Sequence, residues 1–184
     1  MSNKRASIRR ARKESQKMEH TKPITNLDKW KKIRYEGQMD GKLYGIYAMW
    51  HVLYTEYGWK GKRCSKFIEL ASDAALKTNS QDGANVITYV WYDRVTEAMP
   101  PAETDLNGTD VELIERGIYG DARNEYFKYI CMFCLDALND HYGFGTKRVD
   151  RVLELLAKEY KLMQHKSPEW FKERGKSEVG IDMD

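Results

Sequence analysis

The sequence predicts a mainly α-helical protein that contains two similar helical hairpins and begins with a basic arm. Nearly the same seven letters occur twice, YGWKGKR from Tyr57 and YGFGTKR from Tyr142. Apolar residues recur at helical spacing on both sides of each copy. Residues 1–22, MSNKRASIRRARKESQKMEHTK, are rich in charge and have no apolar period. Such a segment has little to bury, so we expect a flexible, solvated arm.

The two copies align without a gap at one constant offset along the chain. The matched pairs include Tyr44 with Tyr129, Leu53 with Leu138, Gly58 with Gly143 and Glu69 with Glu154. We therefore interpret residues of about 40–77 and 125–163 as an internal duplication, each copy forming a helix, a glycine turn and a second helix. With residues 1–22 as the arm, residues 23–184 form the helical body.

Apolar positions define the second helix of each copy. Their spacing follows the period of an amphipathic helix. In the first copy they are Cys64, Phe67, Ile68, Ala71 and Ala75, and in the second Val149, Val152, Leu153, Leu156, Tyr160 and Met163.

Shorter helices are predicted outside the repeats from their end signals. NLDKWKKIRYEG suggests a helix that is capped by Asn26 and ended by Gly37. TDVELIERGIYG suggests a short helix capped by Thr109. In SPEWFKERG, Ser167 is the expected cap and Pro168 occupies the first helical position.

The segment between the copies is ambiguous. GANVITYVWYDR is rich in β-branched and aromatic residues, and it fits a strand as well as a helix. The following Pro100–Pro101 pair indicates a loop.

Charge is distributed unevenly along the chain. Residues 1–35 contain 12 Lys and Arg against 3 Asp and Glu, a net charge of +9, and the remaining residues contain 19 against 25, a net charge of −6. No apolar run approaches the roughly 18 residues needed to cross a bilayer. The charged beginning lacks the apolar stretch of a secretory signal, and three cysteines cannot all pair within the chain. We expect a cytoplasmic protein with no membrane association.

The repeated turns also carry repeated cations, and these are our candidate binding residues. A left-handed glycine that ends a helix, followed by an aromatic ring, explains Gly58 and Gly143. It does not explain basic residues at the start of the next helix, where the helix dipole disfavours cations. They form internal salt bridges or a solvated face, or they bind an anionic partner. The candidates are Lys62, Arg63, Lys66, Lys147, Arg148 and Arg151, together with Arg9, Arg10 and Arg12 of the arm.

Cysteine and histidine residues give no clear metal site. Cys131 and Cys134 form a C-x-x-C pair with His141 nearby, but the pair falls on an apolar helical stripe. Free cysteine in such a place packs as a small hydrophobe, so we expect core positions. His51 and His141 have no nucleophile or carboxylate at a motif spacing. We expect no metal, no cofactor and no enzymatic activity.

LNDHYGFGTKRVDRVLELLAKEY resembles a family of small proteins encoded by phages and prophages of Gram-positive bacteria. Those proteins combine an Arg-rich start with a G-F-G-x-x-R helical hairpin, matched here by Gly143, Phe144, Gly145 and Arg148. SPEWFKERG resembles the closing helix of the family. The first copy departs from the motif, because Trp59 and Lys60 replace Phe and Gly.

The resemblance implies a mobile-element origin and a protein that acts by binding in a bacterial host cell. The size of the chain resembles that of anti-CRISPR proteins, and the first expectation is an inhibitor of a host defence nucleoprotein such as Cas9 with its guide RNA. The arm would then contact RNA or DNA, and the acidic body a positively charged channel. The alternative is a nucleic-acid-binding regulator or replication accessory protein of a phage.

Overall fold

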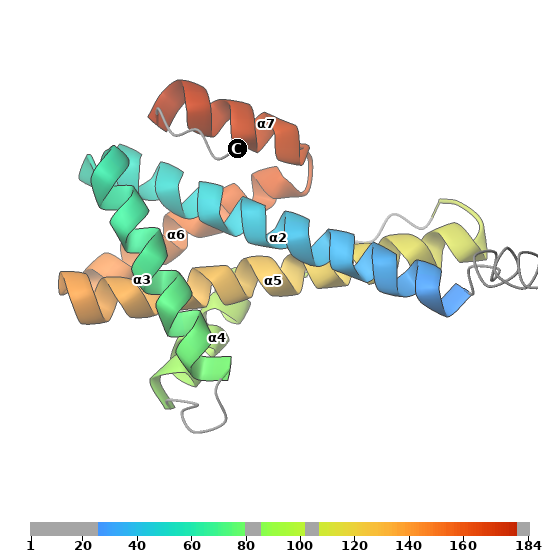
Figure 1. The fold of residues 1–184 in the computed structure, drawn as a ribbon, viewed down its shortest axis with the longest axis horizontal. Helices are drawn as coiled ribbons and strands as arrows, with labels where there is room; N and C mark the ends of the chain where they lie inside the picture. Colours follow the sequence, from blue (N-terminus) through green and yellow to red (C-terminus); the bar gives the residue numbers. More distant parts are fainter. Residues whose placement is uncertain (1–25, 80–85, 102–106, 180–184) are drawn as a thin grey trace, which may run out of the picture. The chain divides into compact units, whose positions relative to one another are not determined.

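The computed structural model describes residues 26–79, 86–101 and 107–179, and it confirms a mainly α-helical fold with no strand in these ranges. The chain divides into two compact units, Met1–Lys32 and Ile33–Asp184. The packing below concerns the second unit (Figure 1). The arm predicted for residues 1–22, with Arg9, Arg10 and Arg12, lies outside the described residues.

Two long helices, α2 (Asn26–Tyr57) and α5 (Asp110–Tyr142), lie side by side and run in the same direction (Figure 1). Three glycines one turn apart on α2 face α5. A Cβ on Gly37 would lie 2.5 Å from the carbonyl oxygen of Tyr119, and one on Gly45 would lie 2.8 Å from Cβ of Ile130. A Cβ on Gly41 would clash with the backbone of Arg123. The glycines therefore allow the close approach of the two helices.

The helix end predicted at Gly37 is wrong, and the helix that begins after Thr109 is long rather than short. Gly37 lies inside α2, where its missing side chain makes room for another backbone. Thr109 does cap α5 as expected, because its side chain accepts a hydrogen bond from the backbone of Glu112 and the Glu112 side chain accepts one from the backbone of Thr109. The helix then continues through Gly117 and Gly120 to Tyr142.

Both repeated motifs form a glycine turn between two helices. α2 leads through Gly58 into α3 (Gly61–Asn79), and α5 leads through Gly143 into α6 (Thr146–Met163). Both glycines are left-handed, with φ of 63°. Every described hydrogen bond from the residue after the glycine to the next helix start has its counterpart: Trp59 N to Leu53 O and Phe144 N to Leu138 O are each 3.1 Å, and Arg63 N to Lys60 O and Arg148 N to Gly145 O are each 2.9 Å.

The remaining elements are also helical. The ambiguous segment between the copies forms α4 (Val86–Ala98), which packs against α5 and α6. α7 (Pro168–Arg174) begins as predicted, with the Ser167 side chain accepting a hydrogen bond from Trp170 N. A π-helical turn, η1 (Gly175–Val179), follows it directly.

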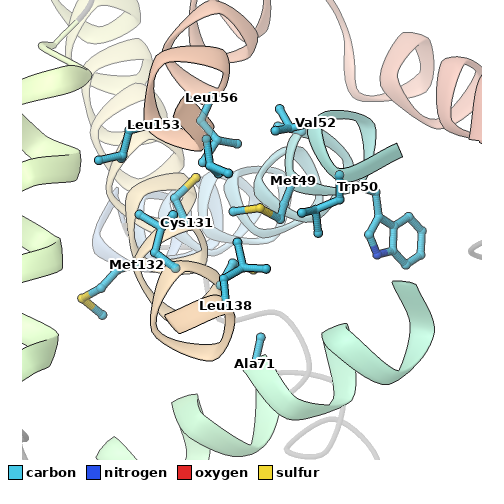
Figure 2. Packing of buried hydrophobic residues seen from close by; sticks show 14 of the residues in the cluster. Met49, Trp50, Val52, Ala71, Cys131, Met132, Leu138, Leu153 and Leu156 are labelled. Atoms are coloured by element: carbon cyan, nitrogen blue, oxygen red, sulfur yellow. The ribbon is translucent and has the colours of Figure 1, made fainter. Parts of the chain in front are cut away.

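The core lies between the helices of the two copies. Figure 2 shows Met49, Cys131 and Leu156 pointing into the space that α2, α5 and α6 enclose. Cys131 and Cys134 are free thiols with almost no exposed surface, so their predicted core position is confirmed. Burial raises the pKa of both thiols well above the usual value. None of the helices in the described ranges is both apolar enough and long enough to span a membrane.

Candidate functional site

The two glycine turns pack directly on one another. The Tyr57 and Phe144 rings have centroids 4.9 Å apart, and those of Trp59 and Tyr142 are 4.6 Å apart. Trp59 and Phe144 also meet, at 6.0 Å, and both are buried, with 3% and 4% of their surface exposed. Four rings, two from each turn, thus join the end of one hairpin to the end of the other.

The ring contacts are symmetric with respect to the two copies. Tyr57 is equivalent to Tyr142, and Trp59 is equivalent to Phe144; Trp59 and Phe144 are here called the central rings of the turns. The tyrosine of each turn contacts the central ring of the other turn. Equivalent residues also meet along the long helices: Gly37 faces Ala122 and Gly45 faces Ile130. Such pairs meet where a local two-fold axis passes between two copies. The described contacts therefore fit a local pseudo-two-fold axis between α2 and α5.

Because the turns meet, their cations gather at one end of the second unit. The set is here called the basic surface and consists of Lys60, Lys62, Arg63, Lys66, Lys147 and Arg148. All six residues are exposed. Within the described residues none of the six takes part in an ion pair. The structure thus brings together five of the six predicted cations of the repeats, and adds Lys60.

Two arginines of the basic surface are held by rings. The guanidinium carbon of Arg63 lies 4.1 Å from the centre of the Trp59 ring and 5.6 Å from that of Tyr142. The guanidinium carbon of Arg148 lies 5.6 Å from the centre of the Phe144 ring. Cation–π attraction holds both guanidinium groups against the turns while leaving their N–H donors accessible.

Arg151, the sixth predicted cation of the repeats, is occupied differently. Its guanidinium group donates to both carboxylate oxygens of Glu56, at 3.0 and 3.3 Å, and to Glu154 at 2.9 Å. Hydrogen bonds from Lys158 and from Arg151 lower the pKa of Glu154. Of the two interpretations that the sequence left open, an internal salt bridge describes Arg151.

A second carboxylate near the start of α6 also forms an ion pair. Asp150 pairs with Arg94 of α4. With Glu56 and Glu154 bound to Arg151, three carboxylates near the turns already have cationic partners, and they do not neutralise the basic surface.

Neither second helix begins with an acid. The first turns of α3 and α6 contain no Asp or Glu, and Gly145, the N-cap of α6, has no side chain to accept a hydrogen bond. Cations at a helix N-terminus are disfavoured by the dipole and by one another. The arrangement is unfavourable for the isolated chain and would be relieved by an anion.

A partly buried polar cluster, absent from the sequence prediction, ties the C-terminal segment to α2 and α6. His51 of α2 lies between two carboxylates, with Nδ1 3.0 Å from Glu159 and Nε2 3.1 Å from Glu178. Arg174 pairs with the same carboxylates, at 2.8 and 3.2 Å. Burial alone would raise the pKa of Glu159, but hydrogen bonds from His51 and Arg174 lower it. The partners of His51 lie more than 100 positions away, so no local spacing could have indicated them.

In the described part of the chain, no three His, Cys, Asp or Glu side chains are grouped so that they could hold a metal ion. No protein-family model matches the chain, and no curated protein or solved structure matches it either.

Proposed function

We propose that this protein acts by binding the phosphate backbone of nucleic acid, as a regulator or replication accessory protein of a phage or mobile element. The observation that carries the proposal is the meeting of both turns, which gathers six exposed cations without carboxylate partners. Phosphate contacts by Lys and Arg supply most of the affinity of such proteins, and they do not depend on sequence. The net charge of +9 in residues 1–35 adds to the same attraction.

The test replaces Lys62, Arg63, Lys147 and Arg148 with Gln in the full chain. Fluorescence anisotropy measures its binding to labelled DNA and RNA over a range of salt concentrations. We expect affinity to fall at least about tenfold, and the slope of log K against log salt to decrease by about three to four. The matched control is the double variant Lys42→Glu and Lys161→Glu, which has the same net charge on exposed sites away from the turns. Equal losses in both proteins would contradict a role for the basic surface.

A second candidate function is inhibition of a host defence nucleoprotein, such as Cas9 with its guide RNA. The uneven charge favours it, because a basic surface on residues 36–184, which together have a net charge of −6, can meet both RNA and a positively charged protein channel. The resemblance to phage-encoded proteins adds support. Capture from bacterial lysate, with and without nuclease, separates the two functions. A protein partner that remains after nuclease treatment and loses target cleavage would favour inhibition.

A further inference from the structure

We propose that the basic surface binds duplex rather than single-stranded nucleic acid, with each glycine turn on one strand. This inference rests on the proposed function. It follows from two features of the surface: the equivalence of its two halves and the burial of its rings.

The cations come in equivalent pairs. Lys62 corresponds to Lys147 and Arg63 to Arg148, and each arginine lies on the central ring of its own turn. The backbone hydrogen bonds that begin α3 and α6 also correspond, at 2.9 Å in both turns. These two pairs therefore present equivalent donors on either side of the pseudo-two-fold axis, while Lys60 and Lys66 belong to the first turn alone.

A duplex matches this arrangement because its two antiparallel strands are related by local two-fold axes. Proteins with two-fold symmetry use this match, placing equivalent groups on the two strands. A single strand has no such axis and would meet the two turns in different ways.

The rings of the turns argue against a single strand in a second way. Proteins that bind single strands without sequence preference stack the bases on accessible aromatic side chains. Here Trp59 and Phe144 are buried, and Tyr57 and Tyr142 pack on them. The basic surface therefore has cations that can bind phosphates, but its central rings pack inside the protein and cannot stack on bases.

The experiment compares a fluorescein-labelled DNA duplex of about 24 base pairs with one of its strands, using the full chain. Three proteins with the same change in net charge are measured beside the original. They are Lys62→Gln with Arg63→Gln, Lys147→Gln with Arg148→Gln, and the control Lys161→Glu. Anisotropy is recorded between about 50 and 300 mM KCl.

We expect the duplex to be bound at least about fivefold more tightly than the strand. Each turn variant should weaken duplex binding to the same extent within about twofold, and each should lower the salt slope by about two. Equal or tighter binding of the single strand, or a loss confined to one turn, would overturn the inference and leave the proposed function intact. If no variant changes the binding of either probe, the proposed function itself fails.

Discussion

The α2–α5 pair differs at its two ends. At one end Gly37, Gly41 and Gly45 bring the two backbones together because side chains are missing. At the other end the space between the turns is filled by large rings, among them Trp59 and Tyr142. The comparison teaches how a repeat is preserved or lost. Where equivalent residues of the two copies face each other closely, one must be small if the other is large, as with Gly45 and Ile130, so the two copies have different residues there. At the turns both copies need an aromatic ring, so the two copies have similar residues there.

The largest effect is expected at the turns, where Trp59→Ala and Phe144→Ala each remove a buried ring. We expect each to lower the free energy of unfolding by about 3–5 kcal/mol, because both rings contact each other and the opposite turn. Urea denaturation measures the change. Tyr35→Ala, at a residue with 60% of its surface exposed, is the control and should stay within about 0.5 kcal/mol. A large loss for only one of the two rings would mean that the turns do not support each other.

The next effect tests the glycine end. Gly41→Ala places a Cβ against the backbone of Arg123, so the two helices must separate. We expect a loss of about 2–3 kcal/mol, as for other overpacked positions. Gly117→Ala is the matched control, because a Cβ there meets nothing within 4 Å. It should stabilise the protein by about 0.5–1 kcal/mol through helix propensity. Similar melting temperatures for the two variants would show that the helices do not approach closely at Gly41.

The smallest effect concerns the backbone of the turns. Gly58→Ala and Gly143→Ala keep every ring but force alanine into the left-handed region, since both positions have φ of 63°. A Cβ at either position meets no other atom within 4 Å, so the cost is conformational alone, about 1–2 kcal/mol at each site. Thermal unfolding of the two variants should give nearly equal shifts. Clearly unequal shifts would sharpen the comparison by showing that the two turns differ in strain.

Much of the turn end could be predicted from the sequence, because its signals are local. Glycine before an aromatic ring indicates a helix end, and the apolar spacing after it indicates a second helix. The cap and first residue of α7 were predicted from Ser167 and Pro168 for the same reason. That the hairpins superimpose as whole units stays a prediction.

The glycine end could not be predicted in the same way. A glycine inside a helix and a glycine at its end look alike in the sequence, and the difference at Gly37 depends on a backbone about 85 positions away. Even longer separations in sequence hide the pairing of Arg151 with Glu56 and of His51 with Glu159. The local sequence therefore showed that cations cluster at the turns, but it could not show which of them form salt bridges within the protein.

The parallel course of α2 and α5 has a consequence for how the chain folds. Antiparallel helices joined by a short turn can pair as soon as both are made, but parallel ones need a long return segment between them. Here α3 and α4 lie in that segment, and the described contacts between the two long helices join residues about 80 to 85 positions apart. The entropy of closing so long a loop must be overcome before the contacts stabilise the fold. During synthesis the glycine face of α2 therefore lacks its partner until residues 119–130 of α5 have left the ribosome.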